Sequence, residues 1–110
     1  MTTLQTARLG CGIRVRRAAK IDANQPDIVK ALIQNGCTVV SLAAVGKGCP
    51  DLLVGKLGNN VLIEVKDGRK PPSARSLTDQ QVIFRANWEG QYAVVETIEQ
   101  ALEVMKVAVA

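Results

Sequence analysis

The sequence predicts one α/β domain with the element order αβββαβα. Two segments, 24–35 and 97–106, carry apolar residues at helical spacing behind residues that favour helix starts. Short runs of Val, Leu and Ile between them are bounded by Gly and Asn, which is typical of strands and turns. The chain has 110 residues, 47% of them apolar, so it can fill one core but not two.

The first half of the chain predicts one helix and a three-strand run. Asn24 is a good N-cap, Pro26 suits a first helical turn, and Gly36 ends the helix. Turn residues at 58–60 separate two apolar runs, which predicts a hairpin. The expected elements are a helix over 24–35 and strands over 38–42, 51–55 and 61–66, with a Gly-rich loop over 46–50.

The second half predicts two helices around one strand. Thr78 with Gln81, and Thr97 with Gln100, have the spacing of capping boxes, so each pair predicts a helix start. Residues 67–76 hold prolines, a glycine and several polar residues, which favours a loop. The expected elements are that loop, a helix from 78 to about 88, a strand over 92–95 and a last helix from 97 to about 106.

The net charge of +4 is unevenly distributed along the chain. Residues 1–20 contain five basic side chains and no acidic one, and residues 66–75 add four more against a single aspartate. Such basic segments suit a polyanion such as nucleic acid, although a solvated surface explains them equally well. We expect residues 1–20 to form a basic N-terminal arm and residues 21–110 to form the domain.

The chain contains no histidine and three cysteines. The missing histidine excludes Ser-His-Asp triads, Cys-His pairs and histidine-ligated zinc enzymes. The odd, widely spaced cysteines indicate reduced thiols, and Cys37 is expected to be buried. No apolar run approaches membrane-spanning length, so we expect a cytoplasmic protein with no membrane partner.

The predicted strand over 61–66 carries two charges on one face. Side chains alternate along a strand, so Glu64 and Lys66 point the same way. A hairpin turn centred between Leu57 and Gly58 puts Asp51 directly opposite Glu64, whereas a turn one residue later puts it opposite Lys66. Either register brings Asp51 and Glu64 within about 5–8 Å of each other. The plainer alternative is an ordinary solvent-facing pair of charges on a half-exposed strand.

Carboxylates at this spacing indicate a site for a hard cation. Oxygens from Asp51 and Glu64, with a backbone carbonyl near Val65, suit Mg²⁺ or Mn²⁺ and do not suit zinc. Such an ion polarises a phosphate and lowers the pKa of water, and Lys66 is placed to orient that water or offset developing charge. The pattern therefore predicts phosphodiester hydrolysis.

Four segments taken in order resemble a known family. They are Asp22–Asp27, Ala44–Asp51, Glu64–Gly68 and Leu77–Gln81, and Pro50-Asp51 is separated from Glu64-Val65-Lys66 by twelve residues. This pattern is similar to the PD-(D/E)xK nuclease signature, and more narrowly to stand-alone VRR-NUC (virus-type replication-repair nuclease) domains of phages and bacteria. The likeness covers roughly residues 20–106 and implies a restriction-endonuclease-like core with a mixed central sheet.

The resemblance also implies roles for individual residues. Asp51 and Glu64 would be metal ligands and Lys66 the catalytic lysine, while Gln25, or second to it Asp27, would lie near the metal. Gln81 matches a glutamine of the family, and both Gln25 and Gln81 have an equally good explanation as helix-start residues. Basic residues that flank the site in sequence are candidate phosphate contacts, each with a plain surface role as its alternative. The DNA-binding candidates are Lys47, Arg69, Lys70, Arg75 and Gln81.

The expected activity is that of a Mg²⁺- or Mn²⁺-dependent, structure-selective DNA endonuclease. The resemblance implies branched DNA, such as Holliday junctions, as substrate and a homodimer that presents two sites. One alternative is a DNA-binding module of the same fold without catalysis. Another is an RNA-processing or interaction domain, which the scarcity of aromatic residues disfavours.

Overall fold

A computed structural model describes residues 21–110, and the predicted basic arm over residues 1–20 lies outside the described residues. No helix within 21–110 is both long enough and apolar enough to cross a membrane. In chain order the elements are α1 (Gln25–Gln34), β2 (Thr38–Ser41), β3 (Leu52–Lys56), β4 (Asn59–Val65), α2 (Pro72–Arg75), α3 (Asp79–Asn87), β5 (Tyr92–Val95) and α4 (Ile98–Ala108).

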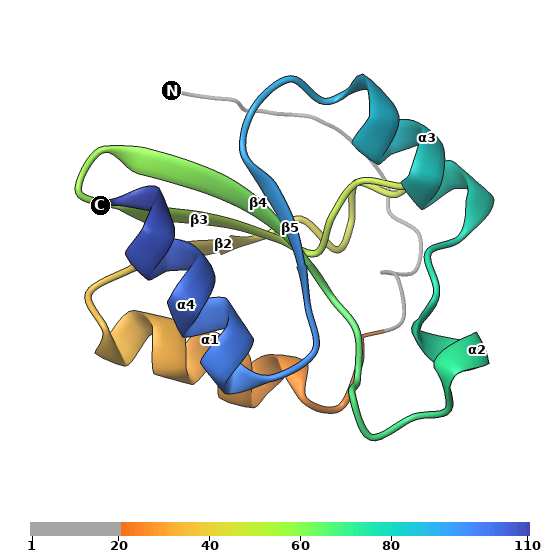
Figure 1. Cartoon of the computed structure of the whole chain (residues 1–110), viewed down its shortest axis with the longest axis horizontal. Coiled ribbons are helices and arrows are strands. Elements are labelled where there is room, and N and C mark those ends of the chain that lie inside the picture. The colour runs from red at the N-terminus through yellow and green to blue at the C-terminus, as the bar shows by residue number, and fades with distance from the viewer. Residues whose placement is uncertain (1–20) are drawn as a thin grey trace.

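The strands form one mixed sheet in the order β2-β3-β4-β5. The pairs β2–β3 and β3–β4 are antiparallel, whereas β5 returns parallel to β4 through the helical crossover. Figure 1 shows α1 and α4 together on one side of the sheet, with α3 near the opposite side. The predicted α/β class and mixed sheet are confirmed, and the predicted element order holds except for one additional short helix, α2.

The apolar core lies between the sheet and the pair α1–α4. Val61, Ile63 and Val65 of β4 face this side and are almost completely buried. Alternation along a strand puts the residues between them on the other face, so the core row dictates where Glu64 points. The other buried members of the core are Ile28, Leu32, Cys37, Leu52, Val54, Val95, Ala101 and Met105.

The hairpin between β3 and β4 has a two-residue turn at Leu57 and Gly58. Both residues have positive φ, 49° and 82°, which is the backbone of a type I′ turn. The turn was expected at 58–60, and the structure places it one residue earlier because Asn59 and Asn60 extend β4 and pair with β3. Of the two registers left open by the sequence, this turn selects the one that puts Asp51 opposite Glu64.

Two smaller expectations about the chain were wrong. The segment 67–76 contains a short helix, α2, which starts at Pro72. The N–H at the first position of a helix has no acceptor within the helix, so a proline there loses no hydrogen bond. Its fixed φ angle also suits a helix start, which favours this short helix. In addition, β3 starts at Leu52, so Asp51 precedes the strand instead of belonging to it.

Asn24 joins three elements where the sequence predicted a simple helix cap. Its side chain makes no cap hydrogen bond to α1. Instead its Nδ2 group donates to the carbonyl of Lys66 at 3.0 Å and to that of Glu96 at 3.1 Å. These two carbonyls lie just beyond the ends of the neighbouring strands β4 and β5. The amide therefore fixes the start of α1 against the end of the strand that carries Glu64.

Replacing Asn24 with Ala should lower the free energy of unfolding by roughly 1–3 kcal/mol, because two partly buried hydrogen bonds are lost and the Glu96 carbonyl keeps only a long bond of 3.4 Å from the Gly68 N–H. Asn35→Ala is the matched control, since its exposed amide makes a single long bond of 3.5 Å within the same helix. Urea unfolding of both variants measures the difference. Equal stability of the two variants would contradict the assigned role of Asn24.

Candidate functional site

Both charged residues of the predicted motif are buried, Glu64 within β4 and Lys66 directly after its last residue. Glu64 is 3% exposed and Lys66 is 8% exposed, so the alternative of a solvent-facing pair does not hold. The Lys66 Nζ atom lies 3.6 Å from the Glu64 carboxylate. Buried charges are unfavourable unless they are paired or bind a metal. The two side chains thus form part of an enclosed polar site beneath α3.

Asp51 reaches this site from the loop before β3. The buried Pro50 precedes it, and the hairpin register continued by one residue places it opposite Glu64. Its Oδ2 atom accepts a hydrogen bond of 2.7 Å from the backbone N–H of Val65. The Asp51 carboxylate therefore accepts a bond that a backbone carbonyl would accept if β3 extended one residue pair further. Asp51 and Glu64 come together as predicted.

The carbonyl of Val65 lies on the same edge as Asp51. Leu62 and Lys66 donate their backbone N–H groups to β5, so Val65 between them turns its backbone groups toward β3. In an antiparallel pair, the N–H and C=O of one residue point to the same side. Because the Val65 N–H meets Asp51, its carbonyl oxygen belongs to the same cluster of oxygens.

Gln81 connects Glu64 of β4 with Lys66, the residue that follows this strand. Its Oε1 accepts a bond of 2.9 Å from the Lys66 ammonium, and its Nε2 donates a bond of 3.1 Å to Glu64 Oε2. The same Oε1 accepts 2.9 Å from the backbone N–H of Thr78, which completes the predicted capping box of α3. Gln81 was predicted as a DNA contact or as a helix-start residue. The structure gives it the helix-start role and, in addition, a place inside the site.

The chemistry of Glu64 is altered by its surroundings. Burial raises the pKa of Glu64 to about 8, with a further contribution from the nearby Asp51 carboxylate, and the Lys66 ammonium only partly offsets these effects. Glu64 therefore keeps its proton to a higher pH than an isolated glutamate would. A cation that bound between the two carboxylates would displace this proton.

The oxygens around Asp51 fit a hard divalent cation. Glu64 Oε1 is buried and has no hydrogen-bond partner among the described residues, and the same is true of Oε1 of Gln25. Gln25 is the first residue of α1, beside the Asn24 amide that holds the end of β4. Within 21–110 there is no cluster of three or more His, Cys, Asp or Glu side chains, so the site has two carboxylates and neutral oxygens. Asp27, the second candidate on α1, is exposed.

The predicted phosphate contacts fall into two groups. Arg69 bonds to Asp67, Lys70 to Asp22 and Arg75 to Glu96, at 2.8–3.1 Å, so three of the candidates pair with acids of the same chain. The Arg69 guanidinium lowers the pKa of Asp67 to about 2. Lys47 is exposed, and none of the salt bridges in the described part of the chain includes it.

Tyr92 and Cys49 adjoin the site although the sequence did not single them out. Tyr92 pairs with Leu62 in the parallel register, which puts it on the same face as Glu64, and its buried hydroxyl has no hydrogen-bond partner in the described part of the chain. Desolvation raises the pKa of Tyr92, and Glu64 raises it further. Burial and the same carboxylates raise the pKa of the Cys49 thiol. Only the strand register reveals Tyr92, whereas Cys49 was recognisable by its position two residues before Asp51.

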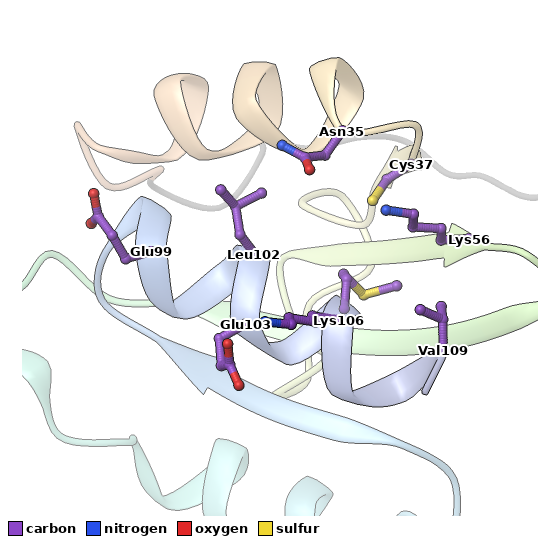
Figure 2. Close-up of a pocket in the computed structure, with 9 residues that line it drawn as sticks. Asn35, Cys37, Lys56, Glu99, Leu102, Glu103, Lys106 and Val109 are labelled. Atoms are coloured by element: carbon purple, nitrogen blue, oxygen red, sulfur yellow. The ribbon is translucent and has the colours of Figure 1, made fainter.

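A separate cavity of about 390 Å³ lies on the α4 side of the sheet. Figure 2 shows Glu99, Leu102, Glu103 and Lys106 of α4 around it, with Cys37 and Lys56 from the sheet side. None of the predicted site residues lines this cavity. Its acidic residues all come from one helix and are solvent-exposed, so the Asp51–Glu64 pair remains the candidate site.

Comparison of the chain with protein-family models, with curated proteins and with solved structures gives no match.

The raised pKa of Glu64 makes the stability of the metal-free protein depend on pH. The folded state binds this proton more tightly than the unfolded state, whose glutamate has the ordinary value of about 4.5, so stability should fall as pH rises from 4.5 to about 8. Glu64→Gln removes the titration and should melt several degrees above the unmodified protein at pH 8 in EDTA.

Melting temperatures at pH 5, 6.5 and 8 test this expectation, with the exposed Glu99→Gln as the matched control. Added Mg²⁺ should restore stability to the unmodified protein at pH 8 but not to Glu64→Gln. Parallel pH profiles for the unmodified protein and Glu64→Gln would show that Glu64 titrates normally.

The loop before Asp51 makes a close contact with α3 at Gly48. A Cβ atom at Gly48 would overlap the backbone carbonyl of Gln80, whereas a Cβ at Gly46 would meet nothing within 4 Å. Both glycines have positive φ, 79° and 72°. Gly46→Ala should therefore cost roughly 1–2 kcal/mol of backbone strain, and Gly48→Ala about 1–3 kcal/mol more from the overlap. Chemical denaturation compares the two, and equal losses would mean that the contact is absent.

Proposed function

We propose that this chain is a Mg²⁺- or Mn²⁺-dependent endonuclease that hydrolyses phosphodiester bonds in DNA. The observation that carries the proposal is the pairing of the half-buried Asp51 with the buried Glu64, which has one carboxylate oxygen without a hydrogen-bond partner within residues 21–110 and a buried lysine beside it. A fold gains nothing in stability by placing two acids together away from water, so such a pair is better explained by chemistry than by packing.

The residues that would hold the ion are those of one oxygen cluster. Asp51 and Glu64 supply carboxylate oxygens and Val65 supplies its carbonyl, while the unpartnered amide oxygen of Gln25 is the candidate on α1. A divalent ion bound there supplies a Lewis acid that polarises the scissile phosphate and lowers the pKa of an attacking water. Oxygen donors of this kind select hard cations over zinc.

Lys66 provides a positive charge held in a defined direction. Its ammonium donates to Gln81 Oε1 at 2.9 Å and lies near Glu64, so one of its three hydrogens remains available for a substrate oxygen. A fixed cation in a buried site stabilises the negative charge that develops on a phosphate during hydrolysis. Lys66 therefore acts on the reacting phosphate or on the attacking water.

Gln81 is a positioning residue for this lysine. Because its amide oxygen also accepts the Thr78 N–H, the side chain cannot rotate without breaking the cap of α3. Its Nε2 holds one Glu64 oxygen and leaves the other free. This arrangement would leave the other oxygen of Glu64 available to bind an ion.

The resemblance to VRR-NUC domains extends the proposal to DNA as the substrate, and in particular to branched DNA such as a Holliday junction. The exposed Lys47 supplies positive charge next to the site in sequence, whereas Arg69, Lys70 and Arg75 are each paired with an acid of the same chain. One chain carries one site, so cutting two strands symmetrically takes a homodimer.

A cleavage assay tests the proposal directly. Labelled linear duplex, flap, splayed-arm and four-way junction DNA are incubated with Mg²⁺, with Mn²⁺ and with EDTA. We expect cutting only with metal, and a loss of about 10²–10³-fold in rate for Lys66→Ala. Lys56→Ala is the matched control, because that lysine ends β3 outside the site.

Two outcomes would contradict the endonuclease. Binding of DNA without cleavage in either metal would favour a non-catalytic DNA-binding module of the same fold. Equal rates for Lys66→Ala and Lys56→Ala would show that any cleavage comes from elsewhere. Sedimentation of the same samples tests the homodimer, which a clean monomer at the assay concentration would exclude.

A further inference from the structure

The three aromatic residues of the chain gather in one place. Phe84, Trp88 and Tyr92 are the single representatives of their types. Phe84 and Trp88 stack with ring centroids 5.7 Å apart and an interplanar angle of 15°, and Phe84 also contacts Tyr92 at 6.4 Å. A hydrogen bond of 3.2 Å from the indole nitrogen to the Gln91 carbonyl fixes the Trp88 ring. Stacking capacity is therefore concentrated at α3.

A groove of about 420 Å³ runs along this helix, and we name it the α3 groove. Its volume falls within the range of roughly 300–1,000 Å³ that small-molecule sites occupy. No residue of α3 is fully buried, and Ile83 is 61% exposed and Trp88 45% exposed. Its lining residues are Lys47, Gln80, Ile83, Phe84, Asn87 and Trp88.

The α3 groove combines an apolar wall with one positive charge and two amides. Lys47 lies at its edge, exposed, on a loop that Gly48 holds tightly against the Gln80 carbonyl. Gln80 and Asn87 add side-chain amides that can both donate and accept. Partly exposed aromatic rings with nearby amides and a cation match a nucleotide, whose base stacks and whose phosphate pairs with lysine.

The α3 groove adjoins the candidate active site through three short connections. Lys47 precedes Asp51 by four residues in the same loop, and Gln80 precedes Gln81, which bonds to Lys66 and Glu64. Phe84 packs on Tyr92, whose side chain lies on the same face of the sheet as Glu64. A nucleotide in the groove would therefore be close to the phosphate under attack.

We propose that the α3 groove binds an unpaired nucleobase of the DNA strand being cut. The base stacks on the Phe84–Trp88 wall, the amides meet its edges, and Lys47 contacts its phosphate. In a fully paired duplex the bases are stacked on one another, so the groove selects DNA that has an unpaired or extruded base next to the cleavage site. The placement beside the scissile bond rests on the proposed endonuclease, but base binding itself can be measured without cleavage.

Trp88 is the only tryptophan, so intrinsic fluorescence reports directly on the α3 groove. The full-length protein is titrated in EDTA with three DNAs: a paired duplex, the same duplex with one unpaired thymine, and the same duplex with an abasic residue in place of that thymine. We expect quenching of Trp88 and a Kd roughly 5- to 150-fold lower for the unpaired thymine than for the abasic DNA.

Two surface variants test the groove without disturbing the core. Ile83→Ser and Lys47→Ala should remove most of the preference for the unpaired base, because both side chains are exposed and line the groove. Val107→Ser and Lys30→Ala are the matched controls, since they change an exposed apolar residue of α4 and an exposed lysine of α1. The controls should keep the full preference.

The outcomes separate this proposal from the endonuclease. Base-dependent quenching in EDTA, with no cleavage in Mg²⁺ or Mn²⁺, would support base binding in the α3 groove and contradict the proposed endonuclease activity. Cleavage without discrimination among the three DNAs would contradict base binding in the groove and leave the endonuclease proposal standing. A third result would also overturn it: if Ile83→Ser abolishes self-association in sedimentation and leaves DNA binding unchanged, the groove is a contact between copies of the chain.

Discussion

The structure of the site depends on one hydrogen bond, from the backbone N–H of Val65 to the carboxylate of Asp51. The hydrogen-bond ladder between β3 and β4 ends at Leu52, so the backbone N–H of Val65 in β4 has no backbone partner in β3. A side-chain oxygen fills this position, and it brings a negative charge directly opposite Glu64. The same contact therefore completes the sheet and assembles the carboxylate pair, and neither task can be changed alone.

The two faces of the sheet carry different kinds of side chain: the apolar core on one and the polar candidate site on the other. Aliphatic residues on the α1–α4 side form the core, which needs no aromatic residue. The other face is crossed by polar side chains and covered by α3, which buries none of its own residues completely. The core thus fixes β4 from one side, while Glu64 and Lys66 are buried on the other side near the first turn of α3. The ion pairs of Arg69, Lys70 and Arg75 hold the segment that connects β4 to α3.

Local patterns in the sequence predicted the elements and much of the site, but not its long-range contacts. Alternation along β4 correctly placed Glu64 and Lys66 on one face, and capping-box spacing located α3. The hairpin register stayed open, because only the φ angles of Leu57 and Gly58 decide it. The Asn24 contacts and the Lys70–Asp22 pair, which spans 48 residues, have no local signal. Tyr92 required the parallel register of β5, which the crossover sets.

The double use of Gln81 makes the first turn of α3 part of the candidate site. If this turn frays, Thr78 loses its amide partner and Lys66 loses its anchor at the same moment, since one oxygen serves both. The folded protein is then a mixture of molecules in which Gln81 holds Lys66 and molecules in which it does not, and only the first kind would be competent for the proposed hydrolysis. The observed turnover would be the intrinsic rate multiplied by the fraction of competent molecules. Anything that rests on α3 and steadies its first turn, including a bound strand, would raise that fraction without touching the carboxylates.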